Sequence, residues 1–288
     1  MTLDWIAEPW ASGLMRRAFA ETILAGAACG ALGCFVLVRG LAFLGESVAH
    51  TIILGVALAF LAGFPVGLGV VAVAAGTVIL VQGISADRRL SRDTAMGIVL
   101  PSLFGAGVAL IALSEGYRTR LEDVLFGAVL GVTEADVALA ALVVGITALT
   151  LLVAGKELVL VAFDGSQAAA MGYRVALLDA LLLGVVALAA VIALRAVGNV
   201  LLTALLLGPP ATARLLCRAF WPMAALAAGW AAAAGVIGLY ATWYLDVGAG
   251  PAIVLVVVAG YLGAALGAYL RDRRTEEIEV RANAAAAS

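Results

Sequence analysis

The sequence predicts an all-α fold, a polytopic helical membrane protein with eight to nine transmembrane segments. Hydrophobic residues make up 65% of the 288-residue chain and charged residues only 12%. The mean hydropathy is +1.14, so the chain carries more apolar surface than a soluble protein of this length can bury. The apolar residues also fall into runs of about 20, the length that a helix needs to cross a hydrocarbon core of ~30 Å.

Nine apolar runs are the candidate helices, and each is justified by its length and its lack of charge. In chain order they cover 19–38, 44–62, 66–82, 95–113, 135–154, 175–194, 200–213, 222–240 and 251–270. Gly26 and Gly30 in the first run, and Gly263 and Gly267 in the last, are four residues apart, a spacing that lets two helix backbones approach closely. The seventh is short and contains Pro209 and Pro210. Because proline disrupts a helix interior, we expect this segment to be broken and buried in protein.

These runs form one unit. Residues 1–274 are predicted to be a single transmembrane domain, and the polar segment 275–288 is predicted to be a flexible cytoplasmic tail. If all nine runs cross, twelve of the 17 Lys and Arg residues lie on one side of the membrane. The positive-inside bias then places the N-terminus outside and the C-terminus inside. A hairpin at the short seventh run would reverse everything before it.

Glu46 and His50 are the first candidates for chemistry, since they lie near the start of the second run and His50 is the only histidine. Their spacing of four places them on one helical face. A carboxylate and an imidazole suit a divalent transition ion, and two ligands alone give the transient binding that conduction needs. The alternative is a structural bond between the two. For Glu21 and Asp179, which lie near predicted membrane edges, we favour ordinary solvated carboxylates over functional roles.

Two loops on the predicted cytoplasmic side could receive an energy-coupling partner. Residues 162–174, AFDGSQAAAMGYR, suit a small helix that ends at Gly172. Residues 213–222, ARLLCRAFWP, form an amphipathic turn with Arg214 and Arg218 four apart. Either segment could instead be a basic loop that the positive-inside bias requires.

Several functions are disfavoured by what the sequence lacks. No G-x-x-x-x-G-K-[ST] phosphate loop occurs, and a single histidine excludes a two-histidine zinc site within the chain. A membrane enzyme is therefore not expected, nor is a permanently bound cofactor. The net charge of -2 does not suggest a nucleic-acid partner.

Five stretches, in order along nearly the whole chain, resemble the permease subunits of ABC importers for zinc, manganese and iron. They are RRAFAETILAGAACGALGCFVLVRGLAFLGESVAHTIILGVALAF, LEDVLFGAVLGVTEAD, AFDGSQAAAMGYRV, AVGNVLLTALLLGPPATARLL and YLDVGAGPAIVLVVVAGYL. The second run of that family opens with an FLGD-x-x-x-H motif, whose acid and histidine are thought to contact the ion in transit. These map onto Glu46 and His50, with Glu where Asp is usual.

The resemblance implies a homodimer in the cell membrane, two copies of a separate ATPase and an extracytoplasmic metal-binding protein, with lipid around the helices. It also implies that the segment after Pro210 seats on the ATPase, which makes Arg214 and Arg218 the coupling candidates. About eight helices are usual in the family, which leaves the crossing of the seventh run open.

We therefore expect the permease of an ATP-driven importer of a divalent transition metal, zinc before manganese or iron. Three alternatives stay open. A proton-coupled secondary transporter would use Glu46 or Asp179 as a relay and work alone. An importer of a metal chelate would need a wider and more polar path. A structural membrane scaffold would leave Glu46 and His50 unexplained.

Overall fold

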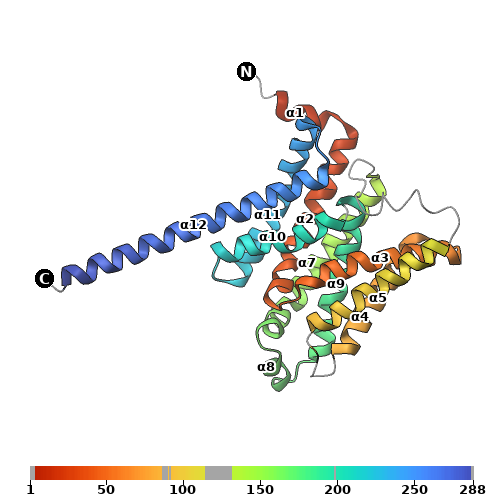
Figure 1. Ribbon diagram of the computed structural model, residues 1–288, viewed down its shortest axis with the longest axis horizontal. Coiled ribbons are helices and arrows are strands. Elements are labelled where there is room, and N and C mark those ends of the chain that lie inside the picture. Colours follow the sequence, from red (N-terminus) through yellow and green to blue (C-terminus); the bar gives the residue numbers. More distant parts are fainter. Residues whose placement is uncertain (1–3, 86–89, 91, 114–131, 198, 287–288) are drawn as a thin grey trace.

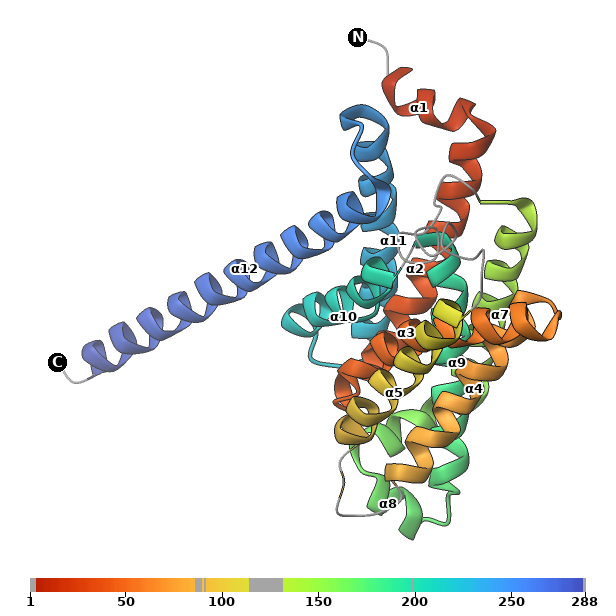
Figure 2. The same cartoon turned by 45° about the vertical axis from the view of Figure 1, so that its right-hand side comes forward.

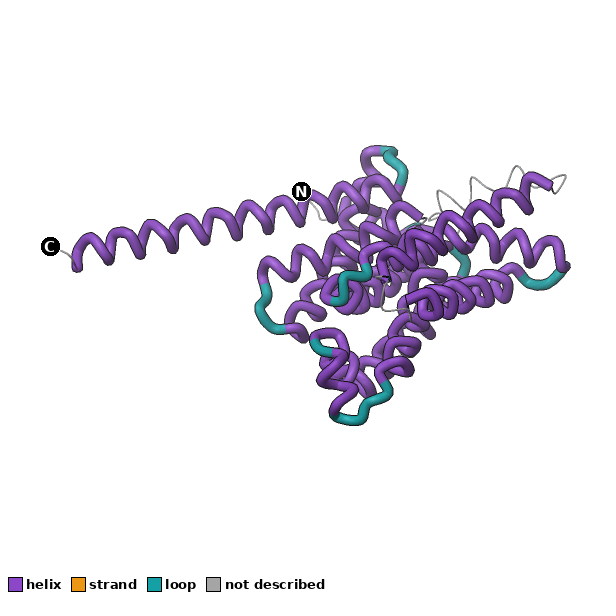
Figure 3. The backbone as a smooth tube through the Cα atoms, turned by 60° about the horizontal axis from the view of Figure 1, so that its bottom comes forward, coloured by secondary structure: helices purple, strands orange, loops and turns teal. Residues whose placement is uncertain are grey.

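The computed structural model describes residues 4–85, 90, 92–113, 132–197 and 199–286. The described chain is helical throughout, with no strand (Figure 3). The helices are α1 (Asp4–Ala11), α2 (Gly13–Val38), α3 (Ala42–Ala62), α4 (Val66–Ser85), α5 (Arg92–Leu113), α7 (Glu134–Phe163), α8 (Gly165–Ala170), α9 (Val175–Val197), α10 (Asn199–Leu216), α11 (Phe220–Leu245) and α12 (Ala249–Ala286). The all-α prediction is confirmed.

Seven helices within the described residues are long and apolar enough to cross a membrane. They lie in α2, α4, α5, α7, α9, α11 and α12, and shorter apolar helices lie in α3 and α10. All nine predicted runs are therefore helical. The count of eight to nine crossings stays a prediction, because length and composition alone select seven.

The helix α2 lies at the centre of the bundle and packs against α11, α10, α7 and α9. Its contact with α11 depends on Gly26 and Gly30, as the spacing predicts. A Cβ atom at Gly30 would lie 2.5 Å from the carbonyl oxygen of Ala227, and one at Gly26 would lie 3.1 Å from the backbone of Ala231. Glycine is required here because the two backbones touch. The second predicted pair, Gly263 and Gly267 of α12, makes no such approach, because an added Cβ there meets no described atom within 4 Å.

The helix α10 corrects the prediction of a broken segment. It continues from Asn199 to Leu216 with Pro209 and Pro210 inside it, and it forms no hairpin. Proline at 210 leaves the carbonyl of Leu206 without its usual helical donor. That carbonyl instead packs directly onto Gly33 of α2, where the absent side chain makes room. Both prolines are buried, as expected, because α10 packs against α2, α11 and α12.

The C-terminal segment is helical, because the backbone of α12 continues to Ala286. The flexibility of the tail at 275–288 stays a prediction. Glu, Arg and Ala in this segment are good helix formers, and it contains no glycine or proline to end the helix. Figures 1 and 2 show α12 leaving the bundle and extending away from it.

The bundle has two distinct ends. The N-terminus and the turn from α11 to α12 lie at one end, and α8 lies at the other, together with the turn from α2 to α3 (Figures 1 and 2). At the first end the indole of Trp10 donates a hydrogen bond of 2.7 Å to the hydroxyl of Tyr240. Trp10 also stacks on Phe19 at 4.4 Å between ring centroids. These contacts fix α1 and α2 against α11.

Candidate functional site

The helix α3 carries Glu46 and His50, and its backbone is helical at both positions. The side chains of residues 42–50 lie outside the described part of the structure, so the orientation of Glu46 and His50 stays a prediction. The first described side chain after His50 is that of Thr51. This side chain is fully buried and accepts a hydrogen bond of 3.1 Å from the hydroxyl of Thr77 in α4. This buried polar contact aligns α3 with α4 one residue beyond His50.

Glycines hold α3 tightly between its neighbours. A Cβ atom at Gly55 would lie 2.7 Å from the carbonyl oxygen of Gly69 in α4, and one at Gly107 in α5 would lie 2.7 Å from the amide nitrogen of Leu54. Contacts this short exclude any side chain, so α3, α4 and α5 pack backbone to backbone. The helix that carries the candidate metal ligands is therefore held in a fixed register against α4 and α5.

A buried ion pair joins the end of α2 to the start of α9. The guanidinium Nη1 of Arg39 donates to Oδ1 of Asp179, and the two side chains are only 4% and 5% exposed. Arg39 begins the α2–α3 turn, and Asp179 lies in the second turn of α9, the helix that follows α8. The prediction that Asp179 is a solvated carboxylate is wrong, because its position on α9 faces α2 rather than solvent.

Glu21 corrects the same expectation. It is 1% exposed and lies within the central helix α2. The sequence position of Glu21 predicts that it lies near a membrane edge, but it does not predict which helices surround it. A carboxylate this deeply buried among helices is a structural or functional feature rather than a solvated surface group.

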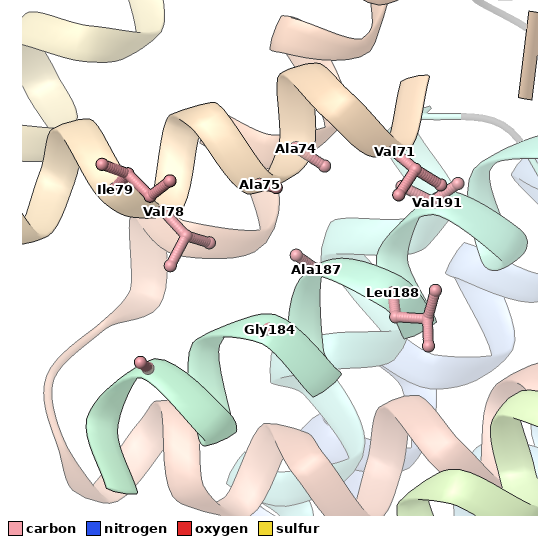
Figure 4. Close-up of a pocket in the computed structure, with 10 residues that line it drawn as sticks. Val71, Ala74, Ala75, Val78, Ile79, Gly184, Ala187, Leu188 and Val191 are labelled. Carbon is pink, nitrogen blue, oxygen red and sulfur yellow. The ribbon is translucent and has the colours of Figure 1, made fainter. Parts of the chain in front are cut away.

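An apolar cavity lies between α4 and α9 (Figure 4). Its volume is about 250 Å³. It is lined by Val71, Ala74, Ala75, Val78 and Ile79 of α4 and by Ala180, Gly184, Ala187, Leu188 and Val191 of α9. None of these side chains can donate a lone pair to a cation, so this cavity is not a candidate metal site.

The small helix predicted within residues 162–174 is confirmed as α8. Asp164 caps it, because Oδ1 accepts hydrogen bonds from the hydroxyl of Ser166 (2.6 Å) and the amide of Gln167 (2.9 Å). These bonds hold the pKa of the Asp164 carboxyl below its usual range. The cap is therefore fully formed at neutral pH and is lost only when acid protonates the carboxylate. Gly172 ends the segment with a φ of +86°, which favours glycine.

The second predicted segment, 213–222, covers the end of α10, the turn to α11 and the start of α11. Arg214 lies in the last turn of α10 and Arg218 lies in the turn, and both are exposed. Phe220 begins α11, and its ring packs against Phe35 of α2 at 4.5 Å and Phe163 of α7 at 6.3 Å between centroids. The aromatic contacts of Phe220 thus anchor the turn beside the two exposed arginines to α2 and α7.

Within the described residues, no group of three or more His, Cys, Asp or Glu side chains could hold a metal ion. The same residues contain polar contacts that the sequence did not point to, Arg39–Asp179 and Thr51–Thr77. Charge in or beside an apolar run was the available signal for Arg39 and Asp179. Nothing in the spacing of the threonines marks them as partners.

A model of the ABC 3 transport family matches residues 11–268. The chain belongs to this family. It is 32% identical over 249 residues to the manganese import system permease protein ScaB of Streptococcus parasanguinis, covering 86% of this chain and 88% of that protein. It is 30% identical over 256 residues to the chelated iron transport system membrane protein YfeD of Yersinia pestis, with 89% and 86% covered.

A solved structure shows the same fold. PsaBC of Streptococcus pneumoniae, in complex with a Fab, superimposes with a TM-score of 0.81 at 30% identity, covering 92% of this chain and 95% of that chain. The resemblance to permease subunits of metal-type ABC importers is confirmed. The chain is a multi-pass plasma-membrane protein and not an enzyme, since ATP hydrolysis belongs to a separate subunit of the transporter.

Proposed function

We propose that this permease carries a divalent transition metal into the cell, with Glu46 and His50 as the groups that contact the ion in transit. The motif FLGESVAH on α3 carries the proposal, because it places an acid and the single histidine of the chain four residues apart. A carboxylate oxygen and an imidazole nitrogen replace part of the hydration shell of the ion without trapping it. No metal is held permanently.

The identity of the metal is the finer part of the proposal. The sequence leads us to expect zinc first, but the names of the similar proteins above give manganese and chelated iron. Manganese is therefore the first cargo to test. A metal chelate is the second candidate, which the name of YfeD favours.

The arrangement of the transporter follows from the same proposal. With the N-terminus outside and the C-terminus inside, α8 and the α10–α11 turn lie on the cytoplasmic half, where an ATPase must dock. A homodimer with two ATPase copies, fed by an extracytoplasmic metal-binding protein, completes the assembly. The exposed apolar side chains of α12, Leu255, Leu262 and Leu266, are open to lipid or to a second copy of the chain. An apolar helix that leaves its own bundle must be covered by lipid or by another chain.

Uptake by proteoliposomes tests this function. Vesicles that contain the permease with its ATPase should accumulate radioactive manganese, delivered by the binding protein, only when ATP reaches the ATPase. A proton-coupled transporter would instead take up metal from a proton gradient with the permease alone. Uptake without the ATPase would overturn the proposal. Competition by excess zinc, ferrous iron and an iron chelate ranks the possible cargoes, and the mass of the intact complex reports whether two permeases are present.

Charge reversal tests the docking role of Arg214 and Arg218. The double variant Arg214→Glu/Arg218→Glu is expected to weaken binding of the ATPase by about tenfold or more, because like charges then face the partner across the interface. The matched control is Arg271→Glu/Arg273→Glu, which makes the same charge change at two exposed positions of α12. Pull-down of the ATPase measures both. Equal loss in the two variants would show a general charge effect and contradict the assignment.

A further inference from the structure

The ion pair between Arg39 and Asp179 joins two segments that the function has not yet connected. Arg39 is the C-cap residue that directly follows α2, and only Gly40 and Leu41 separate it from α3. Asp179 lies in the second turn of α9, five residues after Arg174. On one side of the pair is the helix that carries Glu46 and His50, and on the other is the segment that begins with α8.

The pair is deeply buried, with side chains that are 4% and 5% exposed. By contrast, the ion pair of Arg17 with Glu134 spans 3.9 Å and has side chains that are 39% and 90% exposed. Solvent screens such a surface pair. Arg39 and Asp179 are instead removed from solvent, so each side chain depends on the other to offset its burial.

Position on the helices favours the pair further. Arg39 places its positive charge at the C-terminal end of α2, where the helix dipole is negative. Gly40, directly after it, has a φ of +65°. This conformation suits glycine and sharply reverses the chain into α3. Any displacement of Arg39 is therefore passed through a two-residue turn to the first residues of α3.

We propose that Arg39 and Asp179 form the mechanical link by which movement of the ATPase reaches the metal route. Movement of α8 shifts the start of α9, and the ion pair transmits that shift to the α2–α3 turn and so to the helix of Glu46 and His50. Both residues are positioning residues and do not contact the metal. The inference rests on the proposed function, because it assumes that the ATPase docks at the α8 end.

The packing around α9 is consistent with transmission through a specific bond. The helix α9 packs against α7, α2, α4 and α3. Toward α4, it also borders the apolar cavity of about 250 Å³. The packing of α9 is therefore looser toward α4. The ion pair of Asp179 with Arg39 connects α9 to the α2–α3 turn.

The test measures metal transported per ATP hydrolysed by the permease–ATPase complex in proteoliposomes. Asp179→Asn is expected to keep at least about half of the ATP hydrolysis, whereas the metal-to-ATP ratio falls about tenfold. Exchanging the charges in Arg39→Asp/Asp179→Arg is expected to recover the ratio to within about threefold of the wild type. Arg17→Gln, which removes the exposed ion pair at the other end, is the control and should leave the ratio unchanged.

The apolar variant Arg39→Met/Asp179→Leu distinguishes a role in stabilising the fold from a role in transmitting movement. Replacing a buried ion pair by apolar groups restores stability but not a directional bond. Thermal stability should therefore recover while the ratio stays low. Recovery of the ratio together with stability, or an unchanged ratio in Asp179→Asn, would overturn the link. Absence of ATP-dependent uptake by the wild type would remove the proposed function itself, which is a different result.

Discussion

Replacing Gly33 with alanine is expected to destabilise the permease by about 3 kcal/mol, at the upper end for overpacking of a core. The added Cβ would overlap the carbonyl oxygen of Leu206 and lie 2.7 Å from Cγ of Pro210. Both obstacles are rigid, because one is backbone and the other is a ring. The two helices α2 and α10 must therefore separate, and α2 is the centre of the bundle. Thermal unfolding of the purified permease in detergent measures the loss.

Two other helical glycines supply controls with the same substitution. At Gly76 in α4 and Gly229 in α11, an added Cβ meets no described atom within 4 Å. Because alanine has the higher helix propensity, these variants are expected to be neutral or more stable by up to about 1 kcal/mol. The sign of the effect should therefore differ between Gly33 and the controls. A Gly33→Ala variant as stable as Gly76→Ala would show that α2 and α10 do not pack in this way.

The helices were predictable from sequence because each long apolar run must avoid water, and a helix satisfies its backbone hydrogen bonds within the membrane. Their ends were less so. The run 135–154 was predicted to stop before Lys156 and Glu157, but α7 continues to Phe163. A charged pair marks where a chain leaves the hydrocarbon, and not where its helix ends. The same reasoning applies to α12, which continues past the basic cluster after Leu270.

The buried charges were not predictable, because periodicity does not identify the neighbour that a face meets. The helices in the bundle do not have separate polar and apolar faces, since almost every position in them is apolar. Glu21 and Asp179 could thus be placed near membrane edges, but their burial depends on α2 lying at the centre of the bundle and α9 lying beside it. Long-range packing of this kind leaves no local pattern in the sequence.

The candidate metal ligands stand between these cases. Spacing and residue type selected Glu46 and His50, and the helical backbone that the spacing assumes is confirmed by α3. Two helical turns, or seven residues, beyond them lie Ile53 and Ala57, each of which is 3% exposed. By the helical repeat, the stripe that continues from Glu46 and His50 is therefore a buried one. This supports an inward orientation, which stays a prediction.

Replacing Glu46 and His50 together by alanine is expected to abolish ATP-dependent metal uptake, with a loss of about a hundredfold or more. An ion that crosses an apolar bundle must exchange water for protein ligands, and these two residues supply the proposed charge and imidazole. Each single variant should lose less, about tenfold, because one ligand and water remain. Radioactive manganese uptake in proteoliposomes measures the loss, and pull-down of the ATPase checks that assembly is intact.

Two variants make this result specific to the metal route. Glu134→Ala removes an acid whose side chain is 90% exposed at the start of α7, and it should leave uptake unchanged. Glu46→Asp keeps the charge but withdraws the oxygens by one methylene, so uptake should persist with a changed order of preference among manganese, zinc and iron. The changed order would show that the position of the carboxylate oxygens contributes to metal selectivity, because the general affinity order of the metals does not set selectivity by itself. Wild-type uptake by the double alanine variant would mean that the ion crosses by another route, whatever the orientation of α3.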